Sequence, residues 1–179
     1  MRHLKTIGVA VAALLAFGCL HKSAPESIDA ATDDRLAVEA VYRDIDCPSP
    51  PSAPHAHWID TPHDLQRCWA AQRQVPGKVQ PPPIPEVDFH SQGLLLIHMG
   101  RQSTGGYALA LADPAGRLAG DTLSVTVNWI TPAAGRATVQ MITAPCLLLK
   151  LPRGRYRSIQ VTDTHGRLRV VASLPPPAP

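Results

Sequence analysis

The sequence predicts a mainly β domain of the α+β class, either an antiparallel β sandwich or a partly open barrel, with one early α-helix. Residues 122–130 ("TLSVTVNWI") alternate between apolar and polar side chains, which is the period of a strand with one buried face. Residues 93–99 ("GLLLIHM") form an apolar run of the length of a buried strand. The expected strands follow one another too closely to leave room for crossover helices, which disfavours a parallel α/β fold.

The early helix is expected in residues 61–74, which read "TPHDLQRCWAAQRQ". Thr61 suits the N-cap, Pro62 suits the first helical position, and Asp64 stands where the acidic residue of a capping box is found. The helix should run to about Gln74, because the proline-rich stretch at 75–89 cannot continue it.

Further strands are expected where short apolar or alternating runs are bounded by turn residues. These runs are 35–47, 57–61, 107–112, 137–143 and 146–151, followed by a hairpin at 158–171. Gly166 supplies the left-handed residue in the turn of that hairpin. Together the strands predict a mainly antiparallel sheet that is closed or folded over itself.

The N-terminus has the pattern of a bacterial lipoprotein signal peptide at residues 1–18. A short basic region precedes an uncharged apolar run from Ile7 to Phe17, which is too short to span a bilayer as a helix. A small residue directly before Cys19 resembles a lipoprotein processing site, which implies cleavage before Cys19 and lipidation of its thiol. A plain secretory signal and an uncleaved anchor are the alternatives. Leu20 follows the cysteine, which implies a place in the outer membrane facing the periplasm, with the cell surface as the alternative.

Composition divides the rest of the chain into a flexible tether at 19–34, a single β-rich domain at 35–173, and a disordered proline-rich tail at 174–179. The formal net charge of the whole chain is only +3. With an address outside the cytoplasm, this charge disfavours nucleic acid as a partner. Acidic residues prevail before Arg101 and basic residues prevail from Arg101 onward, which predicts a two-faced charge distribution if the two halves separate in space.

Three cysteines remain after the expected cleavage, and three pairings are possible, each leaving one odd thiol. Cys68 shares one helical face with Leu65 and Trp69, where a free thiol packs as a small hydrophobic group. Cys47 and Cys146 both stand beside prolines at the ends of expected strands. The favoured pairing is therefore a disulfide between Cys47 and Cys146.

The sequence lacks the motifs of the common catalytic classes, with no Gly-x-Ser-x-Gly, no His-Glu-x-x-His and no phosphate-binding loop. No Cys-x-x-Cys pair is present, and His55, His57 and His63 are expected as surface histidines rather than metal ligands. His98 is expected as a hydrogen-bonded, partly buried imidazole rather than a catalytic base. The expectation is a protein that is not an enzyme, with no catalytic residue, metal or cofactor.

The stretch "GRQSTGGY" at 100–107 has two interpretations. It is a tight turn if the glycines take positive φ and the hydroxyl groups close side-chain turns. It is a partner-binding loop if polar groups beside an aromatic side chain are presented on a rigid sheet. The candidate binding residues are Arg101, Gln102, Ser103, Thr104, Gly105, Gly106 and Tyr107.

A second candidate is a basic cluster of alternating arginines, Arg153, Arg155 and Arg157. On a strand these side chains would share one face and present positive charge to an anionic surface or partner. The alternative is a solvated edge that its charges protect against aggregation.

Residues 58–168 contain several of these features in a fixed order. "DF" at 88–89 precedes an apolar strand, "GRQSTGGY" joins that strand to the next, and "TAPCLLLKL" follows downstream. This order resembles the C-terminal domain of the protease complex subunit PrcB family, whose loop has the pattern Gly-x-[Arg/Gln]-x-Thr-Gly-Gly-Tyr. The matching positions are Asp88, Phe89, Gly100, Thr104, Gly105, Gly106, Tyr107 and Pro145. The resemblance implies a non-enzymatic accessory lipoprotein that binds an envelope partner and supports a protease complex.

A looser resemblance competes with this one. "STGGYALAL" is similar in type and setting to the loop with which chagasin-type cysteine-protease inhibitors enter a protease cleft. The chain lacks the Arg-Pro-Trp-like second loop of those inhibitors, since "LPRGRYR" holds its residues in a different order. Protease inhibition by the "STGGY" loop is the alternative function.

Overall fold

The computed structural model describes residues 34–72 and 83–175. The expected signal peptide, the lipidation site Cys19, nearly all of the tether and the last four residues of the tail lie outside the described residues. Within the described ranges, no helix has the length and apolarity that a bilayer crossing needs.

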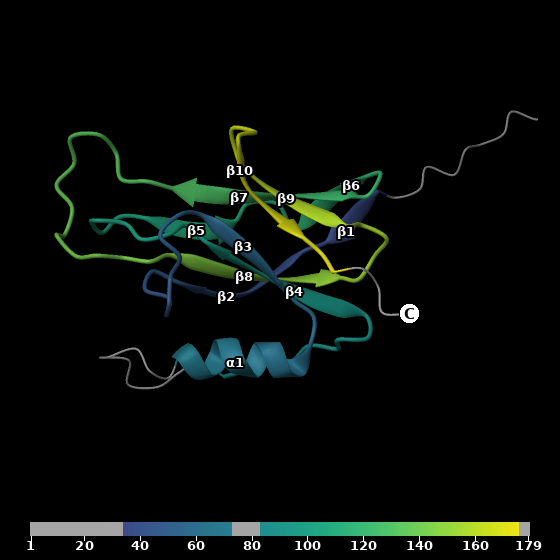
Figure 1. The fold of residues 1–179 in the computed structure, drawn as a ribbon. Helices are drawn as coiled ribbons and strands as arrows, with labels where there is room; N and C mark the ends of the chain where they lie inside the picture. The colour runs from purple at the N-terminus through teal and green to yellow at the C-terminus, as the bar shows by residue number, and fades with distance from the viewer. Residues whose placement is uncertain (1–33, 73–82, 176–179) are drawn as a thin grey trace, which may run out of the picture. The chain divides into compact units, whose positions relative to one another are not determined.

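Ten strands and one helix make up the described part of the domain (Figure 1). Six of the strands form the larger sheet, here called sheet A, in the order β1-β6-β7-β9-β10, with β5 pairing beside β6 on the same edge of β7. All neighbours in sheet A are antiparallel except β7 and β9, which run parallel. The strands are β1 (Arg35–Ala37), β5 (Ala108–Leu111), β6 (Ala115–Ala119), β7 (Thr122–Ile130), β9 (Ser158–Asp163) and β10 (Leu168–Ser173).

The other four strands form sheet B in the order β2-β8-β4-β3, with every neighbouring pair antiparallel. They are β2 (Glu39–Asp44), β3 (His55–Ile59), β4 (Gln92–His98) and β8 (Cys146–Pro152). The two sheets pack face to face and stay separate, so the fold is the expected β sandwich and not a closed barrel. The expected strand at 35–47 splits into β1 and β2, because the chain passes from sheet A to sheet B at the buried Val38.

The apolar run of β4 is explained by burial on both of its faces. Leu95 and Ile97 point into the core between the sheets, whereas Leu94 packs against the helix on the opposite face. In β8, Leu147 and Leu149 likewise face sheet A, and the intervening Leu148 faces the helix. A strand that is covered on both faces has no solvent-facing side that needs polar residues. This explains why apolar residues follow one another in these two runs without polar residues between them.

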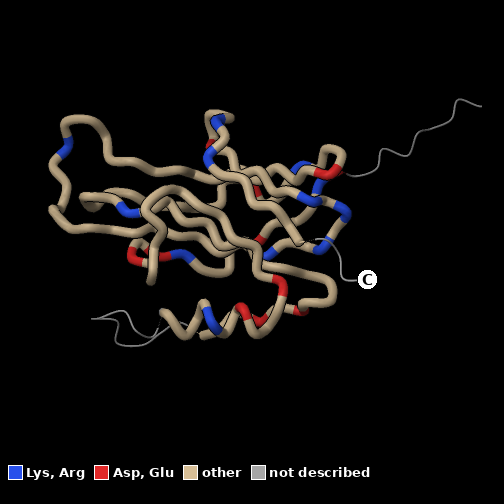
Figure 2. The backbone as a smooth tube through the Cα atoms, viewed as in Figure 1, with Lys and Arg blue, Asp and Glu red and all other residues tan. Residues whose placement is uncertain are grey.

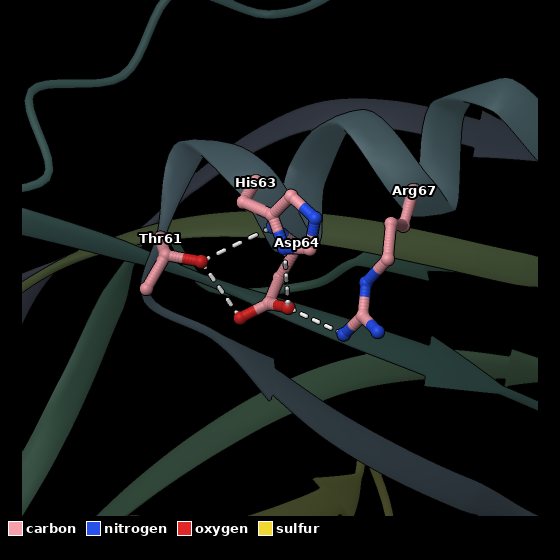
Figure 3. Close-up of polar contacts among 4 residues, drawn as sticks. All are labelled: Thr61, His63, Asp64 and Arg67. Carbon is pink, nitrogen blue, oxygen red and sulfur yellow. Dashed lines mark hydrogen bonds and ion pairs between the residues drawn. The ribbon is translucent and has the colours of Figure 1, made fainter.

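The helix α1 (Pro62–Gln72) covers the face of sheet B that points away from sheet A (Figure 1). The expected cap is confirmed, since the Thr61 hydroxyl accepts a bond from the Asp64 backbone N–H at 3.1 Å (Figure 3). The same hydroxyl donates to the Asp64 carboxylate at 2.7 Å, and Arg67 donates to that carboxylate from the next turn. These bonds lower the pKa of Asp64, and the Thr61 bond has the larger effect. The expected helix end at Gln74 lies outside the described residues.

The expected disulfide is confirmed. Cys47 and Cys146 are bonded, with their Cα atoms 6.0 Å apart, and the bridge ties the segment after β2 to the start of β8. Cys68 is a half-buried free thiol in α1. Its pKa is raised above the usual value of a thiol, mainly by burial.

The expected strand at 137–143 is wrong. These residues belong to a long connection between β7 and β8, in which only Thr143 and Ala144 form isolated bridges. The expected hairpin is confirmed as β9 and β10, with Gly166 in the turn at φ +75°.

Candidate interaction surface

The loop at 100–107 joins β4 to β5 and lies beside the connection between β7 and β8 (Figure 1). The backbones of Gln102 and Thr143 exchange two hydrogen bonds, of 2.8 and 3.0 Å. The Gly105 N–H donates to the carbonyl of Val139 at 2.9 Å, and the Thr143 hydroxyl donates to the carbonyl of Thr104 at 2.9 Å. These bonds hold residues 100–107 and 131–143 together, and we call this pair of segments the two-loop surface.

Two glycines of the loop have conformations that other residues resist. Gly100 has φ +84°, and a Cβ atom there would lie 2.9 Å from the backbone carbon of Ala53. Gly106 has φ +88°, and a Cβ atom there would lie 3.3 Å from Pro132. Positive φ and close backbone approach are the two reasons for glycine at such positions. The tight-turn interpretation is therefore correct for the backbone of this loop, although Gly105 does not share the positive φ.

The side chains of the loop are less available than the sequence predicts. The Gln102 amide donates to the carbonyl of Met99 at 3.2 Å, and the Thr104 hydroxyl donates to the carbonyl of Gly105 at 3.2 Å. Gln102, Thr104 and Tyr107 are half-buried, and Tyr107 packs against the core between the sheets. Arg101 and Ser103 are the polar side chains that the loop exposes. Gln102 and Thr104, two of the candidate binding residues, are thus partly buried and bonded to the loop's own backbone.

The exposed apolar side chains of this region stand on the neighbouring connection. Val139 is 70% exposed, Ile142 is 65% exposed and Met141 is about half exposed. Ile130, the last residue of β7, is also about half exposed just before the connection. Scattered single apolar residues are normal on a surface, but a group of them on one loop indicates a contact site. Arg136 is the one charged residue in 131–145, so the connection presents an almost uncharged apolar surface.

Sequence reasoning missed this group because Val139 and Met141 alternate as they would in a strand. Two features of the nearby sequence could have revealed this group of exposed residues. Met141 and Ile142 are adjacent apolar residues that break the alternation, and the segment lies between Gly135 and Pro145, which both favour irregular backbone. The segment belongs to neither sheet, and its apolar side chains at Val139, Met141 and Ile142 remain exposed.

The basic cluster lies in the connection between β8 and β9, not on a strand. The Arg153 guanidinium donates to the carbonyls of Phe89, Gln92 and Asp60 at 2.8 to 3.2 Å, which gives it a structural role. Tyr156 is buried between its exposed neighbours, donates to the carbonyl of Pro152 at 2.6 Å and packs edge-on against Trp58. Burial raises the pKa of Tyr156 to about 12.

The structure does not bring the two candidate sites together. The two-loop surface precedes β8 and the basic cluster follows it, so they lie at opposite ends of that strand. Figure 2 shows several basic residues along the β8–β9 connection and only one along the β7–β8 connection. Arg155 and Arg157 remain exposed at their end, without the shared strand face that the sequence suggested.

A comparison with known families finds a match, and it covers the two-loop surface. Residues 94–152 match the family model described as PrcB C-terminal. The match begins within β4, includes the loop at 100–107 and the β7–β8 connection, and ends with β8. It confirms over these residues the resemblance that the loop motif suggested. No curated protein and no solved structure matches the chain.

Proposed function

We propose that this chain, which carries a PrcB C-terminal domain at 94–152, is a non-enzymatic, lipid-anchored accessory subunit of a cell-envelope protease complex. It binds its protein partner through the two-loop surface. One observation carries the proposal. Exposed apolar side chains stand on the β7–β8 connection, and hydrogen bonds from the loop at 100–107, which holds the family's motif, keep that connection in place. Apolar anchors on a rigid support are the usual centre of a protein–protein contact.

The disulfide supports the proposed location. A disulfide such as Cys47–Cys146 persists in an oxidising compartment, for example the periplasm or the cell surface. Disulfides are rare in the cytosol. The lipoprotein pattern before Cys19 supplies the anchor. Mass spectrometry of protein extracted from membranes should find a mature N-terminus at a lipidated Cys19, and Cys19→Ser should prevent that processing.

The partner site can be tested by photo-cross-linking in intact envelopes. A photoreactive residue at Ile142 is expected to cross-link a protease subunit. The same residue at Val171 should not, because Val171 is similarly apolar and about half exposed but stands on β10. Equal cross-linking from both positions, or none from Ile142, would refute binding through the two-loop surface.

A matched pair of variants measures the contribution of the anchors. Replacing Val139 and Ile142 by serine should weaken partner binding by about tenfold or more, because truncating exposed anchors removes apolar burial in the complex. Val171→Ser is the control and should leave binding unchanged. Both variants should keep the melting temperature, because the replaced side chains already face solvent.

The alternative, inhibition of a papain-like protease, would need the "STGGY" loop to enter a cleft. Thr104 and Gly105 are half-buried, and residues near Val139 pack beside them, which leaves little of the loop free to insert. Titration of a papain-like protease with this protein is therefore expected to leave its activity unchanged. Stoichiometric inhibition that Thr104→Ala abolishes would favour the inhibitor instead.

A further inference from the structure

The connection between β7 and β8, residues 131–145, contains no helix or strand and extends beyond the ends of both strands (Figure 1). No other connection made entirely of described residues is as long. Loops longer than about 12 residues without secondary structure are uncommon in compact domains, and they often carry a function. Residues 139–143 are bonded to the loop at 100–107, whereas residues 133–137 lie beyond those bonds at the tip.

A single backbone hydrogen bond shapes the tip of this connection. The Arg136 N–H donates to the carbonyl of Ala133 at 3.2 Å, which closes a β-turn. Gly135 stands in this turn at φ +76°, and a Cβ atom there would have no neighbour within 4 Å. Residues 133–137 are all exposed. Nothing in the described part of the chain covers the tip, and one hydrogen bond has to break for the turn to open.

The peptide bond between Arg136 and Ala137 is accessible at this tip. Among the described residues, the carbonyl of Arg136 and the N–H of Ala137 have no hydrogen-bond partner, and the Arg136 guanidinium makes no ion pair. Ala134, Gly135 and Ala137 are small, so no bulky neighbour shields the bond. An endoprotease binds its substrate as an extended segment through these backbone groups, and exposed loop tips with small residues are preferred sites of cleavage.

The fold restrains the other arginines of the described residues. The N–H of Gln102, directly after Arg101, donates to the β7–β8 connection. Arg153 is fixed by three hydrogen bonds from its guanidinium, and Arg155 precedes the buried Tyr156. The remaining ones lie within a helix or strand or directly before a strand, namely Arg35, Arg43, Arg67, Arg117, Arg157, Arg167 and Arg169. Among the described arginines, the one at the tip is thus alone in being flanked on both sides by exposed, irregular backbone.

A cut at this bond would not divide the protein into two molecules. The chain before the bond supplies β1 to β7, and the chain after it supplies β8, β9 and β10. In sheet B, β8 lies between β2 and β4, and in sheet A, β9 pairs with β7. The disulfide between Cys47 and Cys146 also joins the two parts covalently. The cut protein therefore stays folded as two chains, which separate only after reduction and unfolding.

We propose that the bond between Arg136 and Ala137 is a proteolytic processing site for an arginine-specific endoprotease. Hydrolysis adds one water molecule, breaks the C–N bond, and leaves a carboxylate on Arg136 and an amino group on Ala137. Such an enzyme recognises the residue before the cut by placing its guanidinium in an acidic pocket. The product is a disulfide-linked protein of two chains. The site lies at the tip of the two-loop surface, but its cleavage does not depend on the proposed partner binding, and either can fail without the other.

The first test is limited digestion of the full-length protein in detergent by trypsin, which cuts after arginine and lysine. Mass spectrometry gives the initial rate of cleavage at each described arginine. The bond after Arg136 should be cut about tenfold faster than the bond after any other, because its cleavage needs no unfolding of a helix or strand. In denaturing gels, the fragment that begins at Ala137 should separate from the fragment that holds Cys47 only after reduction. Faster cleavage at another described arginine would overturn the proposal.

Two variants separate recognition of the arginine from access to the bond. Arg136→Gln removes the guanidinium and should abolish cleavage at this bond. Arg101→Gln, which removes an exposed arginine from the neighbouring loop, is the matched control and should leave the rate unchanged. Ala137→Pro keeps the arginine but removes the N–H after the bond, and it should also block cleavage. All three variants should keep the melting temperature, because the groups they remove have no partner among the described residues. A bond that is cut equally fast in Arg136→Gln or Ala137→Pro would refute the assignment.

The decisive measurement is made on protein isolated from its own cell envelope in the presence of protease inhibitors. The wild-type protein should contain a fragment that begins at Ala137 and that reduction releases, and Arg136→Gln should lack it. A wild-type chain that stays intact in the envelope would overturn the proposal even if trypsin cuts after Arg136, because the loop would then be merely exposed. A cleaved chain that binds no protease subunit would support the processing site and contradict only the proposed function.

Discussion

The two faces of sheet B are built from alternate residues of the same strands, yet they are packed differently. On the inner face, Leu95, Ile97 and Leu149 are fully buried against sheet A. On the outer face, Leu94 and Leu148 are buried under α1, but a cavity of about 340 Å³ opens beside Leu148. The Nδ1 atom of His98 is buried on this face without a hydrogen-bond partner among the described residues. One set of strands therefore supports a sealed core on one side and an incompletely filled site on the other.

The difference indicates a division of roles. A closely packed apolar face stabilises the folded state. It cannot also bind another molecule, because close packing leaves no room for one. A face with space and an unsatisfied polar atom is less stabilising than it could be, and such local departures from good packing are expected at functional sites. Substitutions on the two faces should therefore differ in what they change.

The largest expected effect concerns the disulfide that links the outer face to the cavity wall. Cys146 belongs to β8, and Cys47 precedes the prolines that line the cavity. The bond closes a loop with a sequence separation of 99 residues, for which the chain-entropy model gives about 4–5 kcal/mol of stabilisation. Replacing both cysteines by alanine should lower the free energy of unfolding by that order, measured by urea denaturation. The oxidised and reduced wild-type proteins provide the control, and a loss below about 1 kcal/mol would contradict the model.

The second prediction compares the stability of variants on the two faces of sheet B. Leu149→Ala on the inner face should cost about 3–4 kcal/mol, because the sealed core cannot collapse around the missing atoms. Leu96→Ala on the outer face should cost roughly 1–2 kcal/mol, because this half-buried side chain already borders empty space. Urea midpoints of the two variants, read with a common m-value, give the ratio. Equal losses would show that the outer face is packed as tightly as the inner one.

A third prediction concerns pH and His98. Its folded-state pKa of about 4 lies below the usual 6.5, so the unfolded chain binds the proton first as the pH falls. Stability should therefore be insensitive to this group above about pH 7 and should decrease between about pH 6.5 and pH 4, by an amount on the order of 2–3 kcal/mol.

His98→Leu should remove that decrease and should be no less stable than the wild type at pH 7.5, because it replaces an unsatisfied polar group by an apolar one. His90→Leu should keep the decrease. The measurement is the free energy of unfolding of the three proteins at several pH values. A His98→Leu variant with the same pH dependence as the wild type would show that other groups cause the loss.

The sequence predicts those parts of the fold that depend on residues close to one another in the chain. The apolar runs of β4 and β8 predict buried strands, and the alternation in β7 and the cap at Thr61 are confirmed in the same way, because each depends on neighbouring residues. The pairing of Cys47 with Cys146 follows from their places at strand ends.

Features that depend on which distant strands pair, and in what register, could not be predicted. His55 and His98 become neighbours only through the register of β3 and β4, and nothing in either segment specifies that register. Residues 137–143 have the composition of a strand, but no partner strand is available to them, so Val139 and Ile142 stay exposed. The pairing of His55 with His98 and the exposed apolar residues of the two-loop surface both belong to this class.

The smallest expected effect concerns Cys68, on the helix side of the outer face. Its thiol is half-buried, lines the cavity and has a raised pKa because of that burial. Cys68→Ala should change the free energy of unfolding by less than about 1 kcal/mol, since one partly exposed sulfur atom borders space that is already empty. Alkylation by iodoacetamide should be slower than for a free cysteine at pH 8, because the thiolate is the reactive form and burial disfavours it. An alkylation rate equal to that of a free cysteine would contradict this burial of the Cys68 thiol.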